Sequence, residues 1–233
     1  MARATRDTAK RGASTRKPPP APRDRMIDAL MALLADRPFA AITLADIAAE
    51  AGVSLADLRE AFGGKAAILA AFVRRIDLAV LGGGEPDMSL GPRDRLFEAE
   101  MRRFDALAPY KPALVSLTRS ARRDPALACL LHGFATRSQK WTLAAAGIHR
   151  GGLAGCATVE GAVLIHLEAL RTWLRDDDED LARTMAALDR GLRRGERAIR
   201  ILDQVCAFAP RLAERGRRMR DSGRTARASR GDA

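Results

Sequence analysis

Cysteines and long apolar runs are scarce in this sequence, and each scarcity excludes a class of protein. The three cysteines, Cys129, Cys156 and Cys206, are odd in number and lie within apolar helical patterns, so a disulfide framework is not expected. No uninterrupted apolar run approaches the roughly 18 residues that a membrane span needs. The N-terminal stretch MARATRDTAKRGASTRKPPPAPR lacks the apolar core of a secretory signal. We therefore expect a cytoplasmic protein without stable membrane insertion.

Signatures of catalysis and metal binding are also missing. The sequence contains no GxSxG motif, P-loop or GxGxxG motif. Cys129 and His132 lie three residues apart in a helical pattern, but no third or fourth metal ligand stands near them in the sequence. The acidic residues 176–180 directly precede an apolar pattern, where negative charge favours a helix N-terminus. We predict no enzymatic activity, no catalytic residues, no bound metal and no cofactor.

Net positive charge is confined to the two ends of the chain. Of the net charge of +11, residues 1–23 carry +6 and residues 211–233 carry +5, so the residues between them are neutral overall. Both ends are rich in Arg, Ser, Gly and Pro, and such segments cannot bury enough apolar surface to fold alone. We expect a disordered basic arm over 1–23 and a disordered Arg-rich tail over 208–233. They are either solubilising ends or arms that contact phosphate groups.

Between these ends, apolar residues recur at three- and four-residue spacing almost throughout. With 233 residues and 47% hydrophobic content, the chain is long enough to bury a large core. No alternating apolar and polar run is long enough for a sheet, so we expect an all-α fold. The glycines at 82–84 and Pro86 divide it into an N-terminal domain over 24–81 and a C-terminal helical bundle over 85–207.

The N-terminal domain is predicted to contain three helices and a fourth that leads out of it. The first covers residues 24–35, and Thr43 and Ser54 are the expected N-caps of two short helices. Gly52 fits the left-handed position that ends the second helix, and the fourth begins at Lys65. Two short helices joined by a tight glycine-containing turn form a helix-turn-helix unit.

This segment resembles the DNA-binding domain of tetracycline-repressor-type (TetR) transcriptional regulators. The stretches ITLADIAAEAGVS and LREAFGGKAAILAAF carry the resemblance, with Thr43, Ser54 and Lys65 in register with the family pattern. The resemblance implies a ligand-responsive regulator, a repressor, that binds a double-stranded DNA operator. The residues it implies for DNA contact are Thr43, Ser54, Leu55, Ala56, Asp57, Arg59 and Lys65.

The third helix of this domain departs from the family in its polar residues. Arg59 and Ala61 stand where family members usually have Tyr and His. Asp57 and Glu60 add negative charge, and residues 24–80 carry six basic against eight acidic side chains. Such a domain alone neutralises few DNA phosphates. Either the basic arms supply the missing charge, or the helix-turn-helix unit is retained without binding DNA.

The C-terminal bundle contains two apolar seams with heptad-like spacing. One consists of Val163, Leu167, Leu170 and Leu174, and the other of Leu181, Met185, Leu188, Leu192, Gly195, Ile199, Leu202 and Cys206. In TetR-like proteins the last two long helices form a four-helix dimer interface, so the resemblance implies a homodimer. The alternative is that both seams pack within one chain.

Four ring side chains of the C-terminal domain are candidate ligand-binding residues. A TetR-like fold implies an effector pocket among the C-terminal helices, and Phe104, Trp141, His166 and Trp173 are its candidate lining. The effector is then small and mostly apolar. The alternative is ordinary core packing, with His166 hydrogen-bonded inside the core.

A second resemblance concerns residues 173–199. This segment is similar to the C-terminal part of ubiquinone-biosynthesis lipid-binding proteins, which have a TetR-like fold. The likeness is carried by Trp173, Thr184, Met185, Leu188, Asp189 and Leu192. It implies an alternative function, a lipid-binding protein that does not recognise DNA.

Overall fold

The computed structural model describes residues 21–84 and 86–204, and these residues are helical with no strand. The helices are α1 (Pro22–Asp36), α2 (Leu44–Ala51), α3 (Leu55–Ala61), α4 (Lys65–Leu81), α5 (Pro92–Leu107), α6 (Lys111–Ala121), α7 (Pro125–Ala145) and α8 (Gly152–Trp173). Short 3-10 turns cover Phe39–Ala41 and Ala108–Tyr110. A last helical run, here called the C-terminal helical segment, covers residues 182–204. The predicted all-α fold is confirmed.

Capping residues set the boundaries of the N-terminal helices where the sequence predicts them. Thr43 and Ser54 are the N-caps of α2 and α3. Gly52 ends α2 with φ of 63°, a left-handed conformation that glycine adopts without a steric penalty. Lys65 is the first residue of α4.

The start of the first helix differs from the prediction. α1 begins at Pro22, because proline suits the first turn of a helix, and therefore includes the last two residues of the basic arm expected over 1–23. Ala21 is the N-cap of α1, and residues 1–20 of the arm lie outside the described residues, as does the Arg-rich tail expected over 208–233.

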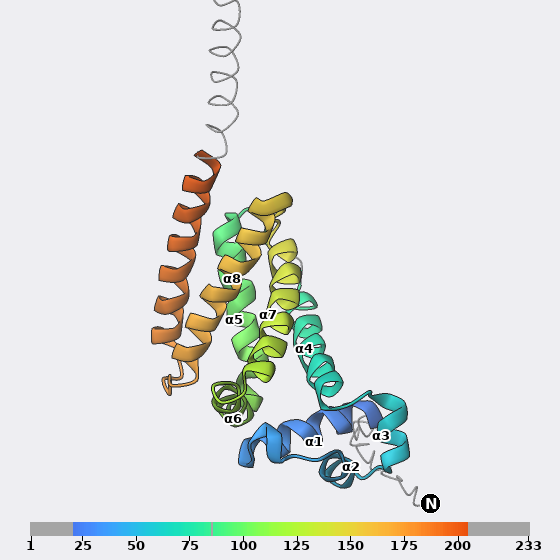
Figure 1. Ribbon diagram of the computed structural model, residues 1–233. Helices are drawn as coiled ribbons and strands as arrows, with labels where there is room; N and C mark the ends of the chain where they lie inside the picture. The colour runs from blue at the N-terminus through green and yellow to red at the C-terminus, as the bar shows by residue number, and fades with distance from the viewer. Residues whose placement is uncertain (1–20, 85, 205–233) are drawn as a thin grey trace, which may run out of the picture.

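Helices α1 to α3 form a unit at the lower end of the molecule in Figure 1, and α4 leads from it to the C-terminal helices. The core of this unit is made by side chains from all four helices, which are at most 5% exposed: Leu30, Leu34, Ile47, Leu58, Phe62, Ile68 and Leu69. α1 also packs against α6. The turn Phe39–Ala41 packs against α6 as well, and the Phe39 amide donates to Ser120 Oγ at 3.2 Å. The helix-turn-helix unit is thus positioned through α4, α1 and this turn.

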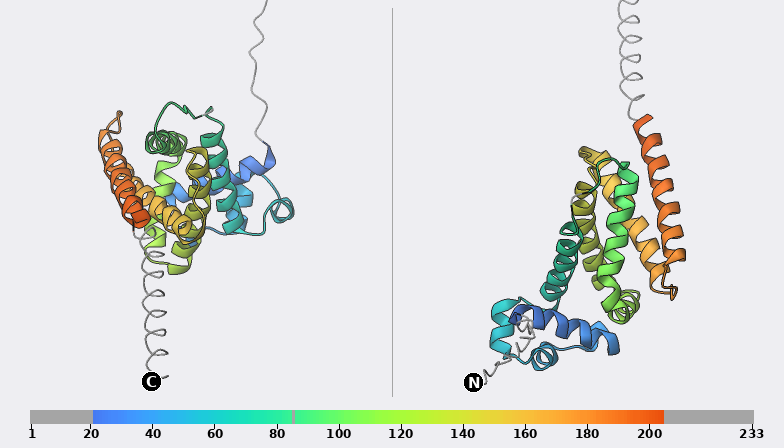
Figure 2. Two further views of the ribbon diagram at one scale, coloured as in Figure 1. Left: turned by 90° about the horizontal axis from the view of Figure 1, so that it is seen from above. Right: turned by 180° about the vertical axis from the view of Figure 1, so that it is seen from behind.

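The C-terminal helices α5, α7 and α8 pack on one another, and the C-terminal helical segment lies beside α8 in the views of Figures 1 and 2. Leu188 and Leu192 are buried, so this part of the second seam packs within the chain. Gly191 and Gly195 permit the close approach, because a Cβ atom added to them would lie 2.8 Å and 2.9 Å from side-chain atoms of Ile165.

In the described part of the chain, α8 alone has the length and the mean hydropathy, 1.5, of a membrane-spanning helix. A core helix of a globular domain meets the same criteria. α8 packs against α5 and α7, and its Val163, Ala169 and Trp173 are buried. However, only 28% of the apolar window of α8 is buried, and Leu153 and Leu164 are exposed. α8 therefore packs on one side within the chain and leaves an apolar surface on the other.

Candidate functional site

The solvent-facing side of α3 is the candidate DNA-contacting surface. Leu58 and the C-cap residue Phe62 are buried and fix the helix to the core of its unit. Leu55, Ala56 and Arg59 are exposed, and Leu55 is 54% exposed despite its large apolar side chain. This surface combines apolar groups, which suit contact with thymine methyl groups, and one arginine, which suits phosphate or guanine.

Asp46 and Asp57, each in the first turn of its short helix, complete capping boxes. The Ser54 amide and hydroxyl donate to Asp57 Oδ2 at 3.0 and 2.7 Å, and the Asp57 amide donates to Ser54 Oγ at 3.1 Å. Thr43 and Asp46 form the same arrangement at the start of α2. Hydrogen bonds from Ser54 lower the pKa of Asp57, and those from Thr43 lower the pKa of Asp46. Asp57, expected to contact DNA, thus stabilises the start of its own helix.

Replacing Ser54 by Ala should therefore destabilise the protein in the absence of DNA. Loss of an N-cap side chain costs about 1 kcal/mol, which lowers the melting temperature of a protein of this size by roughly 2–4 °C. Glu60→Ala is the matched control, because Glu60 is exposed on the same helix and makes no hydrogen bond or ion pair to a described residue. Thermal unfolding followed by circular dichroism measures both variants. Equal melting temperatures for the two variants would contradict the capping role.

Lys65, for which the resemblance implies DNA contact, forms its hydrogen bonds within the protein. Its ammonium donates to the carbonyl oxygens of Phe39 and Ile42 at 2.8 and 2.6 Å and lies 4.5 Å from the centre of the Phe39 ring. Burial lowers the pKa of Lys65. The side chain holds the start of α4 against the turn before α2, so the structure does not present its charge freely to DNA.

Arg23 lies next to the candidate surface and was not singled out from the sequence. Its Nη1 donates to the Ala61 carbonyl at 2.8 Å, and its guanidinium lies 4.2 Å from the centre of the Phe62 ring. It thus joins the start of α1 to the end of α3. In the sequence, Arg23 is one of several basic residues at the N-terminal end, so nothing marks it as a contact of α3. Pro22 could have indicated that the first helix already includes Arg23.

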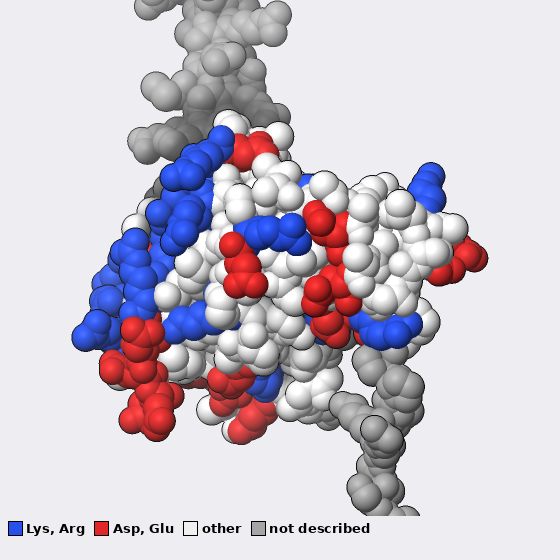
Figure 3. Space-filling model, turned by 90° about the horizontal axis from the view of Figure 1, so that it is seen from below, with Lys and Arg blue, Asp and Glu red and all other residues white. Residues whose placement is uncertain are grey.

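The charge of this end of the molecule is mixed. Seen from below in Figure 3, both signs are scattered over the N-terminal helices, and Lys and Arg gather on the side where Figure 1 places residues 182–204. Four acids of the N-terminal domain are bonded within the chain: Asp28 to Arg75, Asp46 to Thr43, Asp57 to Ser54 and Asp77 to Arg103. The arginine pairs offset the charge of Asp28 and Asp77, whereas the hydrogen bonds from Thr43 and Ser54 keep Asp46 and Asp57 ionised.

Three of the four candidate ligand-binding side chains form one packed cluster. The ring of Phe104 stacks on His166 and on Trp173, with centroid distances of 5.8 and 5.6 Å. Phe104 is 0% and Trp173 is 2% exposed. This is the arrangement of ordinary core packing, the alternative that the sequence left open, and a ligand-binding role for these three residues stays a prediction.

His166 also belongs to a buried polar network. Its Nδ1 lies 2.8 Å from Glu100 Oε2, and Gln139 Nε2 donates to Glu100 Oε1 at 2.7 Å. Burial would raise the pKa of Glu100, but the charge and hydrogen bond of His166, with contributions from Arg103 and Gln139, lower it. Arg103 extends the network by donating to Asp77 Oδ1 at 2.8 Å and to Thr142 Oγ1 at 2.7 Å. The network therefore joins α4, α5, α7 and α8.

Trp141 is separate from the aromatic cluster. It is 58% exposed on α7 and lines a groove beside α4 with Phe134. The structure thus does not bring the fourth candidate ligand-binding residue to the other three.

The residues that carried the second resemblance are largely core residues. Trp173, Thr184, Leu188 and Leu192 are buried. The Thr184 amide and hydroxyl donate to Asp176 Oδ2 at 2.9 and 2.7 Å, which lowers the pKa of Asp176. Thr184 and Asp176 thus stabilise the turn between α8 and the C-terminal helical segment.

A capped helix-turn-helix unit joined by α4 to a separate helical domain defines the class, an all-α helix-turn-helix fold. Residues 26–72 match the family described as bacterial regulatory proteins, tetR family. The chain therefore has a tetR-type helix-turn-helix domain within the fold of TetR transcriptional regulators.

Solved structures support this assignment of the fold. A TetR transcriptional regulator from Nitrosomonas europaea is similar with a TM-score of 0.60 and 24% identity over 75% of this chain and 97% of that chain. A TetR transcriptional regulator from Rhodococcus sp. RHA1 has a TM-score of 0.52 and 18% identity over 75% of this chain and 95% of that one. No curated protein matches the chain.

Proposed function

We propose that the protein is a cytoplasmic, non-enzymatic transcriptional repressor that binds a double-stranded DNA operator as a homodimer and responds to a small effector. The observation that carries this proposal is the exposed surface of α3 within a tetR-type domain. Leu55 and Ala56 face solvent at the start of a capped helix, and Arg59 follows one turn later. A helix presented in this way can enter the major groove.

Under this proposal, some of the residues predicted to contact DNA do so directly, and the others support the helices. Leu55 and Ala56 contact base edges, and Arg59 contacts phosphate or guanine. The N-caps Thr43 and Ser54 hold α2 and α3 in place and are exposed next to the DNA-facing surface. Asp57 and Lys65 support this surface through the internal bonds described above.

Apolar surface on the C-terminal helices supports the homodimer. Gly195, Ile199 and Leu202, three of the last four residues of the seam, line a cavity of about 760 Å³ between α8 and the C-terminal helical segment. The fourth, Cys206, lies outside the described residues. Large exposed apolar side chains lie on the same two elements: Leu153 at 90%, Leu164 at 66% and Ile201 at 61%. Within residues 21–84 and 86–204 nothing covers these side chains, and a second copy of the chain would cover them.

Selection from random DNA duplexes at moderate salt tests the proposal. We expect the full-length protein to enrich a motif with two-fold symmetry and half-sites about 34–36 Å apart, since a dimer presents two recognition helices. Arg59→Ala should weaken binding to the motif, and Leu55→Ala should alter the preferred bases. Arg190→Ala, which removes an exposed arginine from the C-terminal helical segment, is the matched control.

Failure of the folded, full-length protein to enrich any motif would overturn the proposal. The helix-turn-helix unit would then be a retained scaffold, and the lipid-binding alternative would take its place. An asymmetric motif would retain DNA binding and contradict the homodimer.

A further inference from the structure

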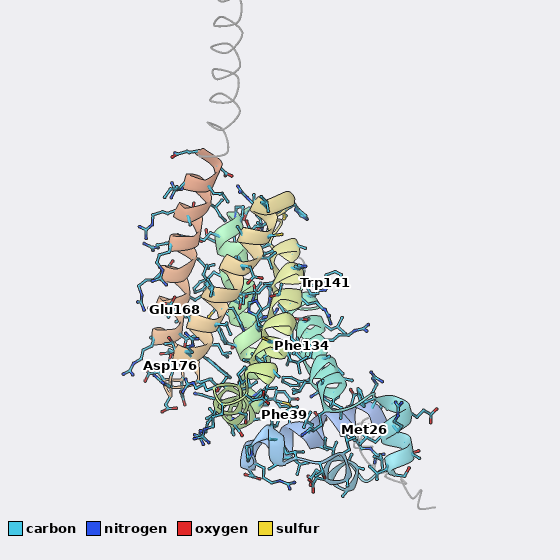
Figure 4. The ribbon with its side chains drawn as sticks, viewed as in Figure 1. Met26, Phe39, Phe134, Trp141, Glu168 and Asp176 are labelled. Carbon is cyan, nitrogen blue, oxygen red and sulfur yellow. The ribbon has the colours of Figure 1, made fainter. Side chains whose placement is uncertain are left out.

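A groove of about 1030 Å³ lies where the helix-turn-helix unit meets the C-terminal domain, between α1, α4 and α7. Its apolar lining includes Ala67, Ala70, Ala71, Val73, Leu81 and Phe134. Trp141 and Leu78 also line it, and each is 58% exposed. Figure 4 shows Phe134 and Trp141 along α7. Two large exposed apolar side chains in one concave site are typical of a binding surface.

The two facing helices repeat one arrangement. On α7, Arg137 precedes Trp141 by four residues, and on α4, Arg74 precedes Leu78 by four residues. Residues four apart lie on the same side of a helix, about one turn from each other. α4 and α7 pack together, so each wall of the groove presents an arginine next to a large exposed apolar side chain.

The groove has an excess of positive charge. Four arginines line it, Arg23, Arg74, Arg75 and Arg137, against the two acids Asp24 and Asp77. Arg75 is paired with Asp28 at 2.6 Å, and Asp77 is bound by Arg103 at 2.8 Å. Arg74 and Arg137 are exposed and make no hydrogen bond or ion pair within residues 21–84 and 86–204. Two guanidinium groups are therefore available to an anion.

We propose that this groove binds a small amphipathic organic anion, a carboxylate with an aliphatic or aromatic body. The body packs on Trp141 and Leu78, and the carboxylate accepts hydrogen bonds from Arg137 and Arg74. A guanidinium matches a carboxylate in a two-point contact, and an indole ring offers a broad apolar face. The groove volume is of the order that drug-sized ligands occupy, roughly 300–1000 Å³.

The place of the groove gives the ligand a regulatory role, and this step rests on the proposed function. The proposed contacts lie on α4, which leads from the helix-turn-helix unit, and on α7, which belongs to the C-terminal domain, while α1 forms another part of the groove wall. Asp77 in the groove wall is bonded to Arg103 and Ser138 of the buried network. A ligand that binds one spacing of α4 and α7 better than another shifts the orientation of the helix-turn-helix unit.

Tryptophan fluorescence tests the binding step without DNA. The chain has two tryptophans, and Trp173 is 2% exposed, so Trp173→Phe leaves Trp141 as the reporter. The probes are decanoate and its neutral counterpart decanol, each below its aggregation concentration. We expect a saturable blue shift with decanoate, because the ligand displaces water from the indole, and binding of decanol at least about tenfold weaker.

Single substitutions locate the site. Arg137→Ala and Arg74→Ala should each weaken decanoate binding about tenfold, the loss expected for one charge-assisted hydrogen bond. Arg190→Ala, which removes an exposed arginine from outside the groove, should leave it unchanged. Absence of a saturable response, equal binding of decanol, or equal affinities of the groove variants and the control would each overturn the proposal.

The same experiment separates this site from the proposed function. Decanoate binding is measured without DNA, so failure to select a DNA motif leaves the site intact. Conversely, if the protein binds a DNA motif but the Trp141 emission does not change with decanoate, the proposed function is supported and the proposed ligand site is contradicted.

Discussion

Replacing Arg103 by Met should cost about 3–5 kcal/mol of unfolding free energy, because it removes the cation from a buried ionic network. Arg103 is 4% exposed and donates to Asp77 at 2.8 Å, while its Nε lies 3.9 Å from Glu100 Oε2. Met fills a similar volume, so the loss comes from buried charge and not from a cavity. Asp77 loses its cation, and Glu100 keeps His166 but loses the more distant cation. Denaturant unfolding monitored by circular dichroism measures this loss.

Two further variants separate buried charge from general disruption. Arg93→Met removes an arginine from a more exposed pair with Asp94 on the same helix, and a pair of that kind contributes roughly 0–1 kcal/mol. Asp77→Asn added to Arg103→Met should recover part of the stability, because it removes one uncompensated charge. A loss below about 1 kcal/mol for Arg103→Met, or no recovery in the double variant, would show that the network is not paired as described.

The contacts of the buried network stabilise the fold and also connect α4 to the C-terminal domain. Asp77 lies on α4, which leads to the helix-turn-helix unit, and its partners Arg103 and Ser138 lie on α5 and α7. Ion pairs and hydrogen bonds tolerate only a narrow range of distances. The network therefore restricts the position of α4 relative to the C-terminal domain. A ligand in the adjoining groove can move α4 only by changing the distances within this network.

Features set by neighbouring residues were predictable from the sequence. The caps Thr43 and Ser54 and the left-handed Gly52 depend on contacts within a few residues, and the structure confirms all three. The role of Asp57 was available from the same signal, because an acid three residues after a serine N-cap completes a capping box. The TetR resemblance instead implies DNA contact for Asp57, because this residue lies on the helix expected to enter the DNA groove.

Features set by the relative placement of helices were not predictable. Lys65 bonds the carbonyls of Phe39 and Ile42, and nothing within α4 indicates that they lie close to it. Trp141 and Trp173 both follow apolar helical spacing, yet one is 58% and the other 2% exposed. Which side of α7 or α8 faces the core depends on how these helices pack, and a single sequence does not state it.

Removing residues 1–20 should weaken DNA binding at all sequences and reduce its dependence on salt. The described part of the helix-turn-helix unit has scattered charges of both signs, whereas this segment contains six Lys or Arg against Asp7. Each phosphate contact contributes about 0.9 to the slope of log affinity against log salt concentration. If all six contact phosphates, their removal reduces the slope by about 5. Between 50 and 200 mM salt, the truncated protein then loses roughly 10³-fold less affinity than the full-length protein.

The salt dependence also distinguishes the two explanations for the basic N-terminal end. Contacts to phosphate carry no sequence information, so the ratio of specific to non-specific affinity should change far less than either affinity. Fluorescence anisotropy with an operator duplex and a scrambled duplex, at several salt concentrations, measures both quantities. A full-length variant with the six basic residues changed to Gln is the matched control for chain length and should behave as the truncation does. If the truncated protein keeps the original slope, the segment is a solubilising end, and the phosphate contacts must come from the folded residues, with Arg59 and Arg23 next to α3 as the first to test.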